Sequence, residues 1–248
     1  MKEKVTTKNN MKGKVMERIE AICHWMKEIV KDAHADGVVF GLSGGIDSAV
    51  VAGLAKRAFG DDALGIIMPI ESNPQDEHDA RLVAESLDLK IEKVDLSKTY
   101  HALVDASMDS DNQLAKNNIK PRLRAVTLYY YAQDRNYLVC GCSNASEFYT
   151  GYFTKYGDSA CDLMPIASFV KSEVVELAKA LDLPKEVIEK KPTAGLYEGQ
   201  TDEDDMGFTY DELDAVIRSD YRGDHRDAID HKHTISEHKR NMPPKFER

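Results

Sequence analysis

The sequence predicts an α/β fold in which a doubly wound parallel sheet is flanked by helices. The run GVVF at 37–40 is short, β-branched and aromatic, as buried strands are, and a glycine-rich turn at 41–48 separates it from apolar residues at helical spacing. Three more strand candidates lie at 63–70, 90–96 and 136–143, separated by stretches long enough for helices. Such connections join parallel strands, so we expect a single domain over residues 1–248.

Helices are expected before and between these strands. One apolar stripe precedes the first strand and is formed by Val15, Ile19, Ile22, Met26, Ile29 and Val30. A second helix is expected over 75–87, and a long helical stretch precedes the last strand. The polar segment 196–208 has little apolar content and is expected to be a mobile surface loop. From about residue 209 onward the chain is charged and helical, with no further strand signal.

Composition narrows the function classes. The net charge is −10, so we expect no general binding to nucleic acid or to an anionic membrane. The sequence contains no apolar run of membrane-spanning length and no signal-peptide core at its N-terminus, so a cytoplasmic location is expected. The four cysteines have no C-x-x-C spacing, which indicates ordinary thiols instead of a disulfide framework or zinc site.

The glycine turn GLSGGIDS is the clearest candidate for a binding site. In parallel sheets, ligands bind beyond the carboxyl ends of the strands, and glycines there let backbone N–H groups surround an anion at a helix N-terminus. The turn lacks the lysine of a P-loop and does not match G-x-G-x-x-G. Ser43 and Ser48 offer hydroxyls, and Asp47 could face a phosphate through Mg²⁺. The alternative is an ordinary turn in which Asp47 stabilises the helix dipole.

The stretch SGGIDS at 43–48 resembles the pyrophosphate loop (PP-loop) of the ATP pyrophosphatases, which cleave ATP to AMP and pyrophosphate. Five later stretches resemble, in order, the signature segments of NAD synthetases: NIKPRLR at 118–124, GCSNASE at 141–147, GYFTKYGD at 151–158, KPTAGL at 191–196 and SEHKR at 236–240. The resemblance implies a Rossmann-like fold of the adenine nucleotide alpha hydrolase type. It also implies ATP-dependent amidation of deamido-NAD by ammonia, through an adenylate, in a homodimer that binds the dinucleotide near the subunit boundary.

The same resemblance assigns residues to each substrate. It places Asp47 and Glu147 on Mg²⁺, with Asp47 and Lys171 as the residues nearest the chemistry. The ATP set is Gly41, Leu42, Ser43, Gly44, Gly45, Ile46, Asp47, Ser48, Cys142, Lys171 and Thr193. The deamido-NAD set is Arg122, Lys155, Asp162, His238 and Lys239. Cys142 departs from the family, which usually has threonine there, and a thiol is a weaker hydrogen-bond partner than a hydroxyl.

Local physics offers a separate argument for two of these cations. Lys171 is expected early in a helix that Ser168 can cap, and Arg122 follows Pro121, which suits a first helical turn. A cation there opposes the helix dipole unless it binds an anion. Lys171→Met is therefore expected to melt no lower than the parent.

Plain alternatives stay open for each assigned residue. Lys171 and Arg122 could be solvated surface cations, and Glu147 could be a helix N-terminal acid. Lys155 and Asp162 could form a surface pair, and His238 and Lys239 could lie on a solvated helix face.

Other functions remain compatible with the loop. A different adenylating amidotransferase or a tRNA thiolase would share it, although a thiolase is expected to bring reactive cysteines and a basic surface. An ATP-binding sensor could keep the fold without the chemistry. Because the sequence offers no segment for a glutaminase domain with a cysteine nucleophile, free ammonia is the expected nitrogen donor.

Overall fold

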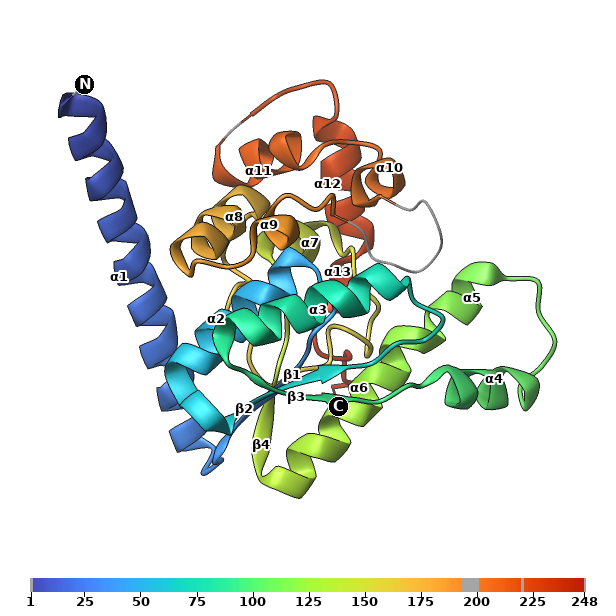
Figure 1. The fold of residues 1–248 in the computed structure, drawn as a ribbon. Coiled ribbons are helices and arrows are strands. Elements are labelled where there is room, and N and C mark those ends of the chain that lie inside the picture. Colours follow the sequence, from blue (N-terminus) through green and yellow to red (C-terminus); the bar gives the residue numbers. More distant parts are fainter. Residues whose placement is uncertain (1, 193–200, 220, 248) are drawn as a thin grey trace.

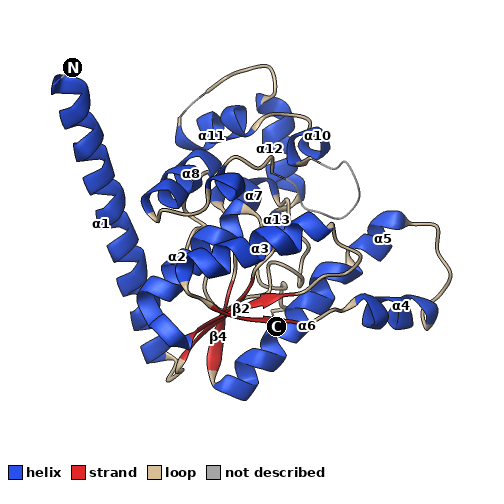
Figure 2. Ribbon diagram, viewed as in Figure 1, coloured by secondary structure: helices blue, strands red, loops and turns tan. Residues whose placement is uncertain are grey.

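The computed structural model describes residues 2–192, 201–219 and 221–247, and its centre is a parallel sheet (Figures 1 and 2). The strands are β1 (Gly37–Gly41), β2 (Ala63–Ile67), β3 (Lys90–Lys93) and β4 (Tyr137–Cys140), in the order β3-β2-β1-β4. All three strand pairs are parallel. The four predicted strands are confirmed, but each of the last three ends three residues before the end of its predicted range.

Helices cover both faces of the sheet, which confirms the doubly wound α/β prediction. Val38 and Phe40 of β1 pack with α1 (Lys2–Asp32), α2 (Ile46–Phe59), α3 (Pro74–Leu87) and α8 (Lys171–Ala180). Val39, on the opposite side of the same strand, packs with α4 (Ser97–Asp105) and α6 (Ile119–Arg135). Alternation of side chains along a strand produces these two separate cores.

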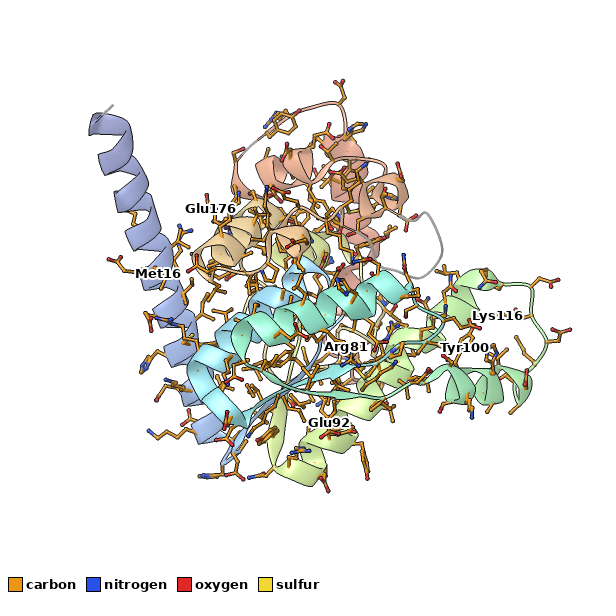
Figure 3. All side chains as sticks on the ribbon, in the orientation of Figure 1. Met16, Arg81, Glu92, Tyr100, Lys116 and Glu176 are labelled. Atoms are coloured by element: carbon orange, nitrogen blue, oxygen red, sulfur yellow. The ribbon has the colours of Figure 1, made fainter. Side chains whose placement is uncertain are left out.

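The predicted stripe on α1 is also confirmed. Ile19, Ile22, Met26 and Val30 are buried, and Val15 and Ile29 pack against the same cluster. Met16, labelled in Figure 3, packs there as well. The N-terminal part of α1 extends beyond the rest of the fold (Figure 1). Nothing in the described part of the chain is both long and apolar enough to form a membrane-spanning helix.

The expectation of a mobile loop at 196–208 is wrong for its described part, residues 201–208. Helix α10 (Asp202–Met206) lies there, and Met206 and Phe208 are buried in a third, small core with Tyr210, Leu213, Val216 and Ile229. The last three come from α11 (Tyr210–Arg218) and α12 (Arg226–Ile235), followed by α13 (Glu237–Arg240). Two apolar side chains are enough to anchor this segment because the neighbouring helices supply the rest of the core. The mostly polar sequence of the segment gives no sign of those helices.

The strand order determines where a ligand can bind. The chain runs outward from β1 to β2 and β3, then returns to place β4 on the other side of β1. The carboxyl ends of β1 and β4 therefore form the topological switch point at which open parallel sheets bind ligands. The glycine turn follows β1 at this point. The remaining elements are a 3-10 turn (Gly60–Asp62), α5 (Gln113–Asn117), α7 (Ala145–Thr150) and α9 (Lys185–Ile188).

Candidate active site

A cavity of about 1040 Å³ lies at this switch point. Its lining includes nearly all of the glycine loop, with Asp47, and the side chains of Glu147 and Lys171. Residues of α3, α6 and α13 complete the walls. The volume is at the upper end for a small-molecule site, so it suits a large substrate or two substrates together.

Gly44 explains the glycine-rich sequence of the loop. Its φ is +81°, and a Cβ at this position would lie 2.3 Å from the carbonyl oxygen of Asp76 in α3. The loop therefore packs directly against α3. Gly45 is the N-cap of α2, and no side chain in the described part of the chain caps it. The first N–H groups of α2 are thus available to an anion.

The two serines of the loop differ in their roles. Ser48 is buried and its hydroxyl donates to the carbonyl oxygen of Gly45 at 2.9 Å, which braces the loop from within. Ser43 is exposed, and its Oγ lies 3.0 Å from Ser48 Oγ and accepts from Gly45 N–H at 3.3 Å. Of the two hydroxyls that the sequence suggested as phosphate donors, Ser43 is the accessible one.

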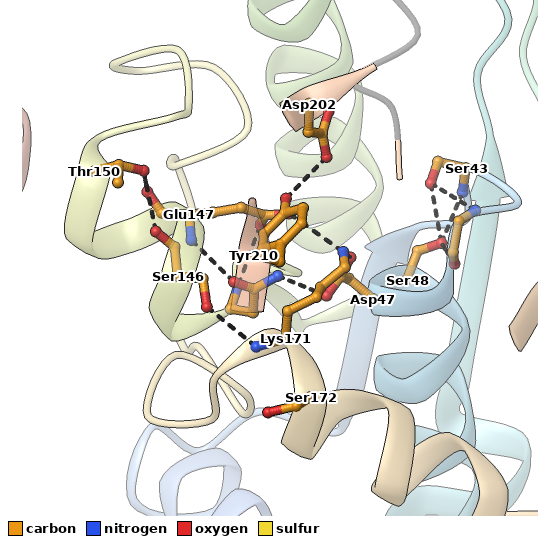
Figure 4. Close-up of polar contacts among 12 residues, drawn as sticks. Ser43, Asp47, Ser48, Ser146, Glu147, Thr150, Lys171, Ser172, Asp202 and Tyr210 are labelled. Atoms are coloured by element: carbon orange, nitrogen blue, oxygen red, sulfur yellow. Dashed lines mark hydrogen bonds and ion pairs between the residues drawn. The ribbon is translucent and has the colours of Figure 1, made fainter. Parts of the chain in front are cut away.

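A buried lysine lies between the two predicted metal ligands (Figure 4). Lys171 Nζ is 2.6 Å from Asp47 Oδ2 and 3.8 Å from Glu147 Oε1, and its side chain is only 8% exposed. Although burial alone would lower it, the charges of Asp47 and Glu147 raise the pKa of Lys171 above its ordinary value. Burial and the charge of Asp47 raise the pKa of Glu147 well above its ordinary value, against the opposing effect of Lys171. The structure therefore brings these three predicted residues together, although Asp47 and Lys171 are 124 positions apart in the sequence.

Asn144 connects the carboxylates and was missed from the sequence. Its side chain accepts from Glu147 N–H at 2.9 Å and donates to Asp47 Oδ1 at 2.8 Å. Glu147 in turn accepts from Asn144 N–H at 3.2 Å, which completes a capping box at the start of α7. The N-x-x-E spacing at 144–147 was a signal that could have identified this pair.

The start of α8 differs from the expectation. The helix begins at Lys171 with Val170 at its N-cap, so the expected cap by Ser168 is wrong. Asp214 of α11 caps it from outside: its carboxylate accepts from Lys171 N–H at 3.3 Å and from Ser172 N–H at 2.9 Å. Asp214 also accepts from the Ser146 hydroxyl at 2.7 Å. A distant helix thus fixes the backbone from which Lys171 extends.

Asp214→Ala is expected to lower the stability of the folded chain by about 1–3 kcal/mol, because the Ser172 N–H and the buried Ser146 hydroxyl lose their acceptor. Since the cap fixes the backbone of Lys171, which the resemblance assigns to ATP, the KM for ATP should rise as well. Thermal melting and steady-state kinetics measure the two effects. Asp211→Ala, an exposed aspartate on the same helix, is the matched control and should change neither quantity. A variant that only melts lower, with unchanged kinetics, would limit Asp214 to a structural role.

Tyr210 and Asp202 form a further wall of the Lys171 site. Lys171 Nζ lies 5.0 Å from the centre of the Tyr210 ring, and the Tyr210 hydroxyl donates to Asp202 Oδ2 at 2.9 Å. The other oxygen, Asp202 Oδ1, is buried without a hydrogen-bond partner among the described residues. Burial raises the pKa of Asp202 above its ordinary value. The segment that was expected to be a loop thus contributes a carboxylate to the cavity wall.

Four of the five residues predicted for the dinucleotide lie together at another part of the cavity: Arg122, Lys155, His238 and Lys239. Arg122 donates to the carbonyl of Lys155 at 3.3 Å, and Lys155 Nζ donates to the carbonyl of His238 at 2.5 Å. Asp162 lies apart from the described lining. Its carboxylate accepts from Val139 N–H at 2.8 Å and from the Tyr129 hydroxyl at 3.0 Å.

The cysteines have the ordinary character expected from the sequence. Burial raises the pKa of all four thiols, to about 11 for Cys161 and also for Cys23, Cys140 and Cys142. Thiolates are therefore disfavoured, and with them nucleophilic catalysis by cysteine. Cys142 lines the cavity with its Sγ 3.8 Å from the carbonyl oxygen of Gly41. Its thiol is therefore directed at the backbone of the loop.

Two further cations in the lining were missed from the sequence. Arg124 is half-buried and donates through Nε to the carbonyl of Met68 at 3.0 Å. Lys190 follows α9 and binds two aspartates of α3. Nothing in the local sequence marks either residue, because their partners lie far along the chain. The predicted ATP residue Thr193 lies outside the described residues.

Comparison with known proteins gives matches over most of the chain. Residues 18–243 match the family described as NAD synthase. The NH(3)-dependent NAD(+) synthetase of Finegoldia magna is 54% identical over 228 residues, which cover 92% of this chain and 95% of that protein. Among solved structures, NMN synthetase from Francisella tularensis has a TM-score of 0.90 at 38% identity, covering 94% and 98% of the two chains. The NH3-dependent NAD synthetase from Campylobacter jejuni has a TM-score of 0.81 at 32% identity, covering 94% and 99%.

Proposed function

Because this chain belongs to the NAD synthase family, we propose that it is an ammonia-dependent ligase that makes NAD⁺ from deamido-NAD, ATP and ammonia, releasing AMP and pyrophosphate. This reaction is the last step of NAD biosynthesis. We propose that residues 1–248 form one synthetase domain and that it acts in the cytoplasm. The main support for this proposal is a single cavity that is lined by both the glycine loop and the Asp47–Lys171–Glu147 cluster. A second set of basic residues, with Arg122, suits another anionic substrate there.

The reaction consists of two displacements. A carboxylate oxygen of deamido-NAD attacks the α-phosphorus of ATP, and the bond from that phosphorus to pyrophosphate breaks. Ammonia then attacks the acyl carbon of the adenylate, the bond from that carbon to the phosphate oxygen breaks, and AMP and a proton are released. Backbone N–H groups at the start of α2, with the Ser43 hydroxyl, would hold the leaving pyrophosphate, and Lys171 would neutralise phosphate charge. Residues 41–48, Cys142 through its backbone and Thr193 complete the proposed ATP site.

Asp47 and Glu147 have the chemistry of a magnesium site. Their oxygens already converge on one cation, the Lys171 ammonium, and Mg²⁺ typically takes one or two carboxylates with phosphate oxygens and water. The described ranges contain no group of three His, Cys, Asp or Glu side chains placed to hold a metal ion by themselves. Bound Mg²⁺ would stabilise the negative charge of the leaving pyrophosphate. Lys171 would then release Asp47 and turn to the phosphates.

The outer face of α6 supports the proposal of a homodimer. Val126, Tyr129 and Tyr130 are exposed on this helix, with exposed fractions of 70%, 39% and 71%. An apolar face of this kind suits a second copy of the chain. Arg122 belongs to the same helix, and Tyr129 donates to Asp162. The dinucleotide residues, Asp162 included, would thus adjoin the boundary between the subunits.

A product assay tests the proposed function. The purified chain with ATP, Mg²⁺, deamido-NAD and ammonium is expected to form NAD⁺, AMP and pyrophosphate in equal amounts, measured by chromatography. Pyrophosphate should appear only when deamido-NAD is present; release without it would contradict the proposal. Glutamine freed of ammonia should give essentially no NAD⁺.

The similarity to an NMN synthetase defines the control substrate. Nicotinate mononucleotide has the same reacting carboxylate but lacks the adenylate half of the dinucleotide. We expect a higher kcat/KM for deamido-NAD, because only the dinucleotide can use both ends of a cavity of this size. A higher kcat/KM for the mononucleotide would overturn the substrate assignment while leaving the amidation chemistry in place.

A further inference from the structure

Lys190 lies where three separate segments meet. Its Nζ is 2.8 Å from Asp76 Oδ1 and 2.6 Å from Asp79 Oδ2, both in the first half of α3. It also reaches the carbonyl oxygen of Gly44 in the glycine loop at 3.5 Å, the outer limit of a hydrogen bond. The two ion pairs therefore hold Lys190 on α3, and the carbonyl contact links it to the glycine loop.

The charge of Lys190 is already committed to these partners. Burial alone would lower its pKa, but the hydrogen bonds to Asp76 and Asp79 raise it, so the side chain is a cation throughout the physiological range. One lysine charge faces two carboxylates, which leaves a net negative cluster. Such a cluster does not attract phosphate by itself, even though Lys190 and Asp76 line the cavity.

The contact between Lys190 and the Gly44 carbonyl affects the conformation of the glycine loop, because the loop packs tightly against α3. Gly44 leaves no space for a Cβ beside the Asp76 carbonyl oxygen. In a trans peptide, the carbonyl of Gly44 and the N–H of Gly45 point in opposite directions. A group that holds the carbonyl on the α3 side therefore directs the Gly45 N–H away from α3. Among the described residues, that N–H donates only to Ser43 Oγ, at a long 3.3 Å.

We propose that Lys190 is a positioning residue that fixes the glycine loop against α3 and so prepares its N–H groups for pyrophosphate. The inference rests on the proposed function of the loop as the pyrophosphate site. Lys190 acts through Asp76, Asp79 and Gly44 and does not itself bind the anion. Donors that are held before the ligand arrives avoid the cost of ordering them on binding.

Binding of inorganic pyrophosphate with Mg²⁺, measured by calorimetry, tests the inference. Lys190→Met should weaken binding roughly tenfold and raise the KM for ATP by a similar factor, since the loop loses its anchor. The KM for deamido-NAD should stay unchanged. Lys190→Arg retains the charge and should restore most of the affinity. Lys190→Met with parental pyrophosphate affinity would overturn the inference.

Lys56 provides a matched control elsewhere in the fold. It too faces two aspartates, Asp61 at 3.4 Å and Asp88 at 3.9 Å, and donates to a backbone carbonyl. Its side chain is 21% exposed, against 22% for Lys190. Lys56→Met should melt slightly lower and bind pyrophosphate like the parent. An equal loss of affinity in Lys56→Met would mean that general destabilisation explains both variants.

Asp79→Asn separates positioning from direct contact with the anion. If Lys190 bound pyrophosphate itself, removing this carboxylate would free the ammonium and strengthen binding. If Lys190 positions the loop through its aspartates, Asp79→Asn weakens binding despite the loss of a negative charge. We expect weaker binding; unchanged or tighter binding overturns the inference. This isosteric variant also serves if Lys190→Met fails to fold. Because the titration needs no turnover, absence of NAD⁺ formation in the parent would contradict only the proposed function.

Discussion

Asp47→Asn is expected to reduce kcat by about 10²-fold or more, because it removes a carboxylate from the proposed magnesium site where charge develops on pyrophosphate. The variant should still fold. Asparagine retains the size of the side chain, and Lys171 keeps Glu147 within 3.8 Å. Steady-state assays at saturating Mg²⁺ measure the loss, and circular dichroism checks the fold.

Two variants make this result specific. Glu147→Gln should show a similar loss, because glutamine can still accept from Asn144 N–H and preserve the start of α7. Asp61→Asn, which changes an aspartate paired with Lys56 and Lys90 on the surface, should keep parental activity. Normal turnover in Asp47→Asn with excess Mg²⁺ would remove Asp47 from the metal site.

Lys171→Met is expected to unfold at a temperature lower by about 10 °C, because breaking a buried ion pair typically costs about 3–5 kcal/mol. This reverses the expectation from the sequence, in which an exposed cation in a first helical turn was unfavourable. In the structure Lys171 is buried and neutralises two carboxylates, Asp47 and Glu147. Calorimetry measures the shift, and ATP affinity should fall in the same variant.

Magnesium ions alone provide a second measurement on Lys171→Met. Without the ammonium, Asp47 and Glu147 are free to bind Mg²⁺, which should raise the melting temperature of this variant more than that of the parent. The double variant Lys171→Met with Asp47→Asn should lose that response. Equal responses of parent and variant to Mg²⁺ would show that Lys171 and the metal do not compete for these oxygens.

The melting deficit of Lys171→Met should also depend on pH. Burial already raises the pKa of Glu147 in the folded chain, and loss of Lys171 raises it further. A carboxyl group with a raised folded-state pKa binds more protons when folded, so stability increases as pH falls toward the unfolded-state pKa. The deficit should therefore be smaller near pH 5.5 than near pH 8. A deficit that is constant across this range would place its origin in packing instead of charge.

Much of the fold could be predicted because its signals are local. The run GVVF and its glycine turn specify a strand, a turn and a helix within a few residues, and alternation of strands with helices specifies parallel pairing. The stripe on α1 follows from helical spacing alone. Segment 201–208 was mispredicted because Met206 and Phe208 are buried only by helices that follow later in the chain.

The sequence by itself therefore determined the α/β class, the position of the glycine loop that we propose binds pyrophosphate and, through resemblance, the residues expected around it. Only the tertiary structure decided how those residues pair. Lys171 is a buried partner of Asp47, Asp214 caps its helix, and Lys190 joins α3 to the glycine loop. The physical reason is that burial and charge pairing depend on distances between segments far apart in the chain. Helical spacing and local propensity carry no information about those distances.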